Sequence, residues 1–355
     1  MDTSVNSRSS NRERKVPVRH RSLALAIVVV VLASLSLAAQ SAPSPKRSTS
    51  GTAAKWTPPR TPDGQPDLQG MWTNATYTPL QRPANLGTKA FYTDEELAAI
   101  EKRRAEQVAD TTEPGTAADV HYDFGQYGLD RSQGVVAPNR RTSLIVDPPN
   151  GRIPPVTPEG QRRAAARAEA RRQMGGAFDG PENRGLPERC IIWNAGPPLV
   201  PIGYNSNYQI LQNADYVMIL TEMIHDVRIV PLDGRPALPQ GIRQLMGSSR
   251  GHWEGNTLVV ETTNFTDRNP FQGSSENMRV TERFTRVADN ALKYEFTVND
   301  PATWAVPWSA EIPMNRIDGP IFEYACHEGN YGLANNLAGA RAAEKAEADA
   351  KKGSR

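Results

Sequence analysis

The chain has 355 residues, of which 38% are hydrophobic and 23% charged, so it is long enough to bury the core of one or two domains. Its 29 prolines and 27 glycines favour a β-rich protein with long Pro/Gly-rich loops over a helical bundle. The formal charge is +2, but residues 1–42 hold six basic and two acidic residues, so the rest of the chain is slightly acidic. This balance gives no support to nucleic acid as a partner.

The first 42 residues have the pattern of an export signal. A basic stretch ends at Arg21, an apolar run extends from Leu23 to Ala39, and small residues follow. We expect residues 1–42 to be a signal peptide or, if uncleaved, an N-terminal anchor that makes the only membrane contact. Residues 43–60 are rich in Ser, Pro, Lys and Thr and are predicted to be a linker. The mature protein is therefore expected to be periplasmic or secreted.

Two cysteines, Cys190 and Cys326, are far apart in the sequence. In an oxidising compartment an even number of cysteines favours a disulfide over a metal pair, so we predict a bond between them.

Residues 61–335 are predicted to form a single β-rich domain with a few helices around it. Thr93 and the acidic residues after it resemble a capping box, which predicts a helix over about 93–107. Thr157-Pro158-Glu159 introduces an Arg- and Ala-rich helix over 157–174, expected to be an exposed surface helix, with a polyanion-binding face as the alternative. A C-terminal helix is expected over about 336–350, within a polar tail that ends at residue 355.

The β core is predicted within residues 207–328. Short apolar runs there are separated by turn signals such as Asp233-Gly234 and Gly255-Asn256. Strict alternation is clearest from Leu292 to Asn299, where every second residue is apolar. Sequential strands joined by short turns predict a mainly β fold, an antiparallel meander forming a lipocalin-like β-barrel, with a β-sandwich as the alternative. Gly70-Met71-Trp72 resembles the Gly-x-Trp that opens the first strand of lipocalin-type barrels, where the Trp plugs one end.

The stretch from Asn207 to Arg228 is predicted to contain a hairpin whose second strand, 216–224, is buried. In an extended chain Glu222 would share a face with the apolar residues Tyr216, Met218, Leu220 and Ile224, where a carboxylate must be paired or protonated. His225 and Asp226 follow directly, and EYACHEGN adds His327 further along the chain. The predicted catalytic set for acid/base chemistry is therefore Glu222, His225, Asp226 and His327.

Six further residues are predicted to line a binding pocket: Arg228, Trp253, Glu261, Asn264, Glu282 and Glu323. Glu282 has Val280 and Phe284 on its face of a predicted strand, whereas the direction of Glu261 is undecided. For each of these residues the alternative is a buried polar network that stabilises the barrel.

Other chemistries have weaker support. There is no G-x-S-x-G nucleophile elbow, phosphate-binding loop or dinucleotide fingerprint, so no cofactor is predicted. A metal site of His225, His327 and a carboxylate such as Glu222 or Asp226 lacks the H-x-x-x-H or H-x-H spacing that would support it. A metal-dependent hydrolase is therefore the third hypothesis.

The strings EMIHD, WEGNTLVVETTNF and EYACHEGN, together with PDLQGMWTN and ERFTR, resemble a widespread family of uncharacterised exported proteins of environmental bacteria. The resemblance implies no activity, cofactor or catalytic residue. Our leading hypothesis from the residues is an exported barrel that takes an apolar or aromatic small molecule into its interior, with isomerase- or lyase-type acid/base chemistry. The rival is a noncatalytic cell-envelope scaffold or interaction protein. The oligomeric state is left open.

Overall fold

The computed structural model describes residues 56–108, 139–193, 196–202 and 204–353. All of them belong to one unit, Trp56–Arg355. The predicted signal or anchor, 1–42, and residues 43–55 of the predicted linker lie outside the described residues. None of the helices in the described part of the chain is long and apolar enough to cross a membrane.

The strands of the described residues form one ten-stranded sheet. They are β1 (Gly70–Thr73), β2 (Ile145–Asp147), β3 (Asn207–Gln212), β4 (Tyr216–Thr221), β5 (Val227–Pro231), β6 (Ser248–Glu254), β7 (Thr257–Thr263), β8 (Arg279–Ala288), β9 (Ala291–Asn299) and β10 (Trp308–Arg316). The α-helices are α2 (Asp94–Val108), α3 (Pro158–Gln173) and α4 (Tyr331–Gly353), and short 3₁₀ turns include η4 (Met223–His225) and η5 (Phe271–Gly273).

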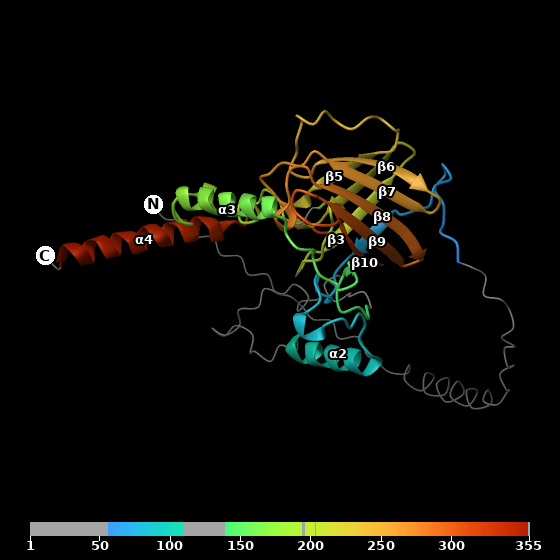
Figure 1. Cartoon of the computed structure of the whole chain (residues 1–355), viewed down its shortest axis with the longest axis horizontal. Coiled ribbons are helices and arrows are strands. Elements are labelled where there is room, and N and C mark those ends of the chain that lie inside the picture. Colours follow the sequence, from blue (N-terminus) through green and yellow to red (C-terminus); the bar gives the residue numbers. More distant parts are fainter. Residues whose placement is uncertain (1–55, 109–138, 194–195, 203, 354–355) are drawn as a thin grey trace, which may run out of the picture. The chain divides into compact units, whose positions relative to one another are not determined.

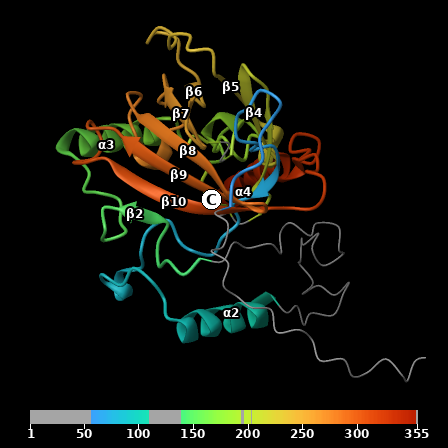
Figure 2. The same cartoon turned by 90° about the vertical axis from the view of Figure 1, so that its right-hand side faces the viewer.

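The order of the strands is that of an up-and-down barrel. They follow one another as β5-β4-β3-β1-β10-β9-β8-β7-β6, and β2 adds to β10. The ladders along this path are all antiparallel. If the two ends of this path are joined into a circle, the strands follow one another in chain order, with β1 between β3 and β10 and with β5 beside β6. Figures 1 and 2 show β6 to β10 as one curved layer. The predicted barrel is confirmed, and the sandwich alternative is not observed.

The barrel is nearly closed because its path has an odd number of strands. Three antiparallel steps lead from β1 to β5 and five lead from β1 to β6. Both strands therefore run opposite to β1 and parallel to each other. Parallel neighbours need a long crossover connection, in contrast to the tight turns that join β3 to β4, β6 to β7 and β8 to β9. We call residues 232–247, which join β5 to β6, the crossover; it is the yellow segment above β6 in Figures 1 and 2.

Side-chain packing closes the gap between β5 and β6. A Cβ atom at Gly251 of β6 would lie 2.7 Å from Leu232 Cδ2 and 2.8 Å from Val230 Cγ1. A glycine at this position therefore lets the side chains of β5 and the crossover approach the backbone of β6.

The interior of the barrel is filled mainly by large side chains. The alternation predicted for β9 is confirmed, since Leu292, Tyr294, Phe296 and Val298 are buried and the residues between them are half-buried. Trp72 of β1 donates from Nε1 to the carbonyl of Leu68 (2.9 Å), and the guanidinium of Arg286 lies over its ring. Trp72 is therefore a fully buried part of the core that is fixed by a hydrogen bond and a cation–π contact.

The predicted helices are present, with one shift. The ranges 93–107 and 157–174 agree with α2 and α3, and Thr157 Oγ1 caps α3 by accepting from the Gly160 amide (3.0 Å). The C-terminal helix was expected over about 336–350, but α4 begins at Tyr331. Asn330 explains the earlier start, because its Oδ1 accepts from the amide of Leu333 (3.2 Å), as an N-cap side chain does.

The burial pattern of β4 differs from the prediction. Its buried residues are Val217, Ile219 and Thr221, whereas Tyr216, Met218 and Leu220 are half-buried on the outer face. The even-numbered residues therefore do not face the core. The strand also ends at Thr221, so Glu222 is not a member of it.

Candidate functional site

The predicted catalytic stretch lies in the turn between β4 and β5. Ile224 and His225 have positive φ angles, 58° and 44°, which reverse the chain direction within a few residues. The structure therefore overturns the placement of Glu222 on a strand face: it precedes η4, where its backbone is helical (φ −62°, ψ −44°).

Glu222 connects the barrel to the C-terminal segment 317–330. Its side chain is only 2% exposed, and its carboxylate accepts from Asn207 Nδ2 (2.5 Å) and from the Phe322 amide (3.1 Å). These two contacts join β3 to the segment that leads to Cys326. They satisfy part of the hydrogen-bonding demand of a buried carboxylate and favour a structural role for it.

Asp226 has a buried carboxylate oxygen and a raised pKa. Its Oδ2 is buried and has no hydrogen-bond partner among the described residues. Desolvation raises the pKa of Asp226 to about 6, against a smaller lowering effect of His225. His225 is exposed, with its Nδ1 3.2 Å from the carbonyl oxygen of Tyr324. A carboxyl group that titrates near pH 6 can act as a general base.

The C-terminal segment 317–330 carries three further residues that the sequence singled out, Glu323, Cys326 and His327. Cys326 is bonded to Cys190, which confirms the predicted disulfide. Glu323 and His327 are exposed side chains. Within the described part of the chain no hydrogen bond or ion pair joins His327 to His225 or Asp226, and no group of three or more His, Cys, Asp or Glu residues could hold a metal ion. The metal hypothesis therefore has no donor set among these residues.

Arg228 and Glu282 form an ion pair inside the barrel. The two side chains are 5% and 0% exposed, and Arg228 Nη2 lies 3.0 Å from Glu282 Oε1 while Nη1 contacts Oε2. Tyr294 donates from its hydroxyl to Glu282 Oε1 (2.8 Å) and accepts from the Leu199 amide (2.8 Å). Burial and the charge of Glu282 raise the pKa of Tyr294 well above its usual value. The polar groups of this cluster are therefore bonded to one another and to the backbone amide of Leu199.

A second site lies on the outside of the barrel. A pocket of about 630 Å³ opens between the crossover and the outer faces of β6, β7 and β8. Its lining comes from residues within 234–243, 248–252, 261–264 and 276–281, and we call it the outer pocket. Glu261, whose direction the sequence left undecided, is exposed and lines this pocket, and Asn264 lies at its edge. Trp253 is half-buried against the core and is not part of the lining.

Asn264 holds the crossover in place. Its φ of 61° ends β7 in the left-handed region, which Asn tolerates better than most residues. From this position its Nδ2 donates to the carbonyls of Leu238 (3.1 Å), Pro239 (2.9 Å) and Ile242 (3.0 Å). The side chain of Asn264, a predicted binding residue, therefore fixes one wall of the outer pocket by bonding to backbone carbonyls of the crossover.

Two arginines of the lining also hold the crossover. Arg250 of β6 donates to the carbonyl of Pro236 from Nε (3.2 Å) and Nη2 (3.1 Å). Arg243 donates from Nη1 to the carbonyls of Phe265 (3.1 Å) and Glu276 (2.6 Å). The crossover is thus held to β6 and to two points of the connection between β7 and β8.

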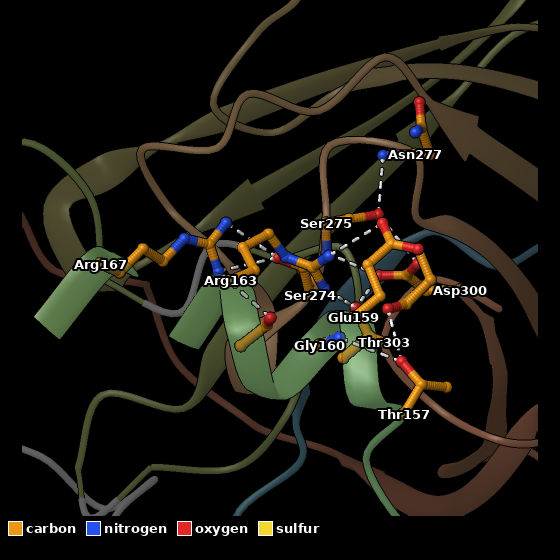
Figure 3. Close-up of polar contacts among 12 residues, drawn as sticks. Thr157, Glu159, Gly160, Arg163, Arg167, Ser274, Ser275, Asn277, Asp300 and Thr303 are labelled. Atoms are coloured by element: carbon orange, nitrogen blue, oxygen red, sulfur yellow. Dashed lines mark hydrogen bonds and ion pairs between the residues drawn. The ribbon is translucent and has the colours of Figure 1, made fainter. Parts of the chain in front are cut away.

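The opposite wall, Glu276 to Met278, is supported by a buried polar network (Figure 3). Asp300 accepts from the Ser275 amide (2.6 Å), from Ser275 Oγ (2.8 Å) and from Thr303 Oγ1 (2.6 Å). Arg167 of α3 donates to the Ser274 carbonyl from both Nη atoms (3.1 Å each). The predicted surface helix therefore turns part of its basic face toward the barrel.

The sequence did not single out four arginines of the outer pocket: Arg235, Arg243, Arg250 and Arg279. The available signal was the alternation of Arg250, His252 and Glu254, which predicts a polar outer face on β6. The pairing of β6 with β7 and of β7 with β8, which brings Arg250, Glu261 and Thr281 into one row, requires the register of the sheet.

The fold and these sites define a nearly closed antiparallel β-barrel with a preformed polar pocket on its outer face. Comparisons with protein-family models, with curated proteins and with solved structures found no match for the chain.

Proposed function

We propose that this protein is an exported β-barrel that binds a small molecule in the outer pocket. The observation that carries the proposal is the pocket itself, whose volume of about 630 Å³ falls in the range of ligand sites, about 300–1,000 Å³. Its walls are held by the hydrogen bonds of Asn264, Arg250 and Asp300, so the cavity does not depend on a ligand for its shape. A preformed site lowers the entropic cost of binding.

The interior of the barrel offers less room for the apolar ligand that the sequence predicts. Seven aromatic side chains of the core are at most 2% exposed: Trp72, Tyr208, Phe284, Tyr294, Phe296, Trp304 and Trp308. Residues of the crossover such as Leu238 and Ala237 supply an apolar surface to the outer pocket instead. We therefore propose that the apolar or aromatic part of the ligand binds in the outer pocket and not in the interior of the barrel.

The proposal is tested by filling the pocket. Thr281 lies on the outer face of β8 in the lining and makes no hydrogen bond through its side chain to another described residue. We expect Thr281→Trp to abolish the binding of hits from a fluorinated fragment library, followed by ¹⁹F NMR. Thr285→Trp, on the same face of the same strand but outside the lining, is the control; it also removes the hydrogen bond between Thr285 Oγ1 and Thr257 Oγ1 (2.7 Å), so circular dichroism must show that it is folded. Retention of all hits by the Thr281 variant would refute the proposal.

A second function is favoured by one observation, the unpartnered Oδ2 of Asp226 beside His225. There the protein would act as an acid/base catalyst of the isomerase or lyase type, with Asp226 as general base. Small-molecule extracts incubated with wild-type protein and with Asp226→Asn, then compared by mass spectrometry, provide the test. A compound consumed by the wild type and equally by the variant would rule out this role.

Export is part of the proposal and rests on the resemblance to exported proteins and on the N-terminal pattern. The Cys190–Cys326 disulfide agrees with an oxidising compartment. The intact mass of the protein isolated from the periplasm would show whether residues 1–42 have been removed. Recovery of the full-length chain from the cytoplasm alone would contradict export.

A further inference from the structure

The charges around the outer pocket do not balance. Arg235 is paired with Asp233, and Arg243 lies 3.3 Å from the carboxylate of Glu276. These pairs neutralise two of the four arginines of the lining.

The other two arginines have no carboxylate partner among the described residues. Arg250 contacts only uncharged oxygens, namely the Pro236 carbonyl, Ser248 Oγ (3.1 Å) and the Ser249 carbonyl (2.6 Å). Arg279, at the start of β8, is exposed, and its side chain makes no hydrogen bond or ion pair within the described part of the chain. Glu261 is the one remaining acidic group of the lining, so these three side chains leave an excess of one positive charge.

The sheet register places this excess around β7. In the register of the sheet, Glu261 lies opposite Arg250 of β6 on one side and opposite Thr281 of β8 on the other, without forming an ion pair with Arg250. Arg279 precedes Thr281 by two residues and so lies on the same outer face. Because β6 and β8 are two strand spacings apart, roughly 9–10 Å, the two guanidinium groups reach the pocket from opposite sides.

We propose that the ligand of the outer pocket is an organic carboxylate with an apolar body, whose acid group binds Arg279. This inference rests on the proposed function and names the class of its ligand. The planar guanidinium of Arg279 matches a carboxylate with two parallel hydrogen bonds. Arg250 adds its positive charge but stays bonded to the crossover. The apolar body lies against Leu238 and Ala237.

Matched pairs of compounds test the acid group. Hexanoate and phenylacetate are titrated by calorimetry beside hexanamide and phenylacetamide, which have the same body without the charge. We expect the acids to bind at least about tenfold more tightly than the amides, as for a hydrogen bond to a charged group in an open site. Raising the salt concentration from 50 to 500 mM weakens the binding of the acids alone.

Three variants locate the charge. Arg279→Gln weakens the binding of the acids about tenfold and leaves the amides unchanged. Arg283→Gln is the matched control, because Arg283 lies on the same face of β8, is paired with Glu254 (2.9 Å) and is outside the lining; it leaves both unchanged. Glu261→Gln removes the opposing charge and strengthens the binding of the acids.

The outcomes separate this inference from the proposed function. Equal binding of acids and amides, no binding of the acids, or an equal loss in the Arg279 and Arg283 variants would overturn the carboxylate assignment. If neutral fragments still bind and Thr281→Trp still blocks them, the pocket remains the ligand site and only the ligand class is wrong. If Thr281→Trp blocks nothing, the proposed function fails as well.

Discussion

The ion pair inside the barrel gives the sharpest prediction of stability. In Glu282→Gln the side chain keeps its shape, but Arg228 loses the only carboxylate that contacts it among the described residues. Arg228 is 5% exposed, and its Nε already has no hydrogen-bond partner in the described part of the chain. Burial lowers the pKa of Arg228 and Glu282 raises it, with a net rise, so the carboxylate offsets the cost of burying this cation.

Removing one partner of a buried pair costs about 3–5 kcal/mol, because a charge is left without compensation. Domains are stable by about 5–15 kcal/mol, so Glu282→Gln should remove a large share of the free energy of unfolding. The double variant Arg228→Met with Glu282→Met removes both charges. It should recover most of the loss, since apolar replacements of whole buried pairs are often neutral or stabilising.

Unfolding in guanidinium chloride measures this difference. The fluorescence of the buried tryptophans, such as Trp72 and Trp308, reports the transition, and the free energy follows from linear extrapolation. A loss below about 1 kcal/mol in Glu282→Gln, or an equal loss in the double variant, would show that the pair does not hold the interior together as we describe.

Three further predictions concern other parts of the chain. Desolvation raises the pKa of Asp226 from 3.8 to about 6, so between these pH values the native state holds a proton that the unfolded state releases. The free energy of unfolding therefore falls as the pH rises through this range. Urea midpoints from pH 4 to 7 should show this fall in the wild type and not in Asp226→Asn. Asn264→Gly removes the three hydrogen bonds to the crossover without straining the left-handed backbone, so amide exchange should quicken within the crossover but not in β9, and unchanged exchange in the crossover would contradict its role. The disulfide spans 136 positions, and the chain-entropy model gives a loss of up to about 5 kcal/mol for Cys190→Ser with Cys326→Ser, measured as a lower denaturant midpoint; an unchanged midpoint would show that the disulfide adds no stability.

The sequence allowed the barrel to be predicted because its signals are local. Alternation along β9 follows from the two-residue period of a strand, and turn residues such as Gly255 and Asn256 mark where the hairpins end. Thr157 likewise predicts the start of α3, since the cap and the amide it bonds are three residues apart. The same local rule failed at Glu222, because β4 ends at Thr221 and the backbone of Glu222 is already helical, so the alternation of a strand does not apply to it.

What the sequence determined by itself is therefore the class of fold, the positions of most elements and the pairing of the two cysteines. The outer pocket was decided only by the tertiary structure. An odd number of strands makes β5 and β6 parallel and sends residues 232–247 across the outside of β6 to β8. Arg279 and Glu261 then meet in one cavity through the sheet register, a relation between distant strands that no local periodicity contains.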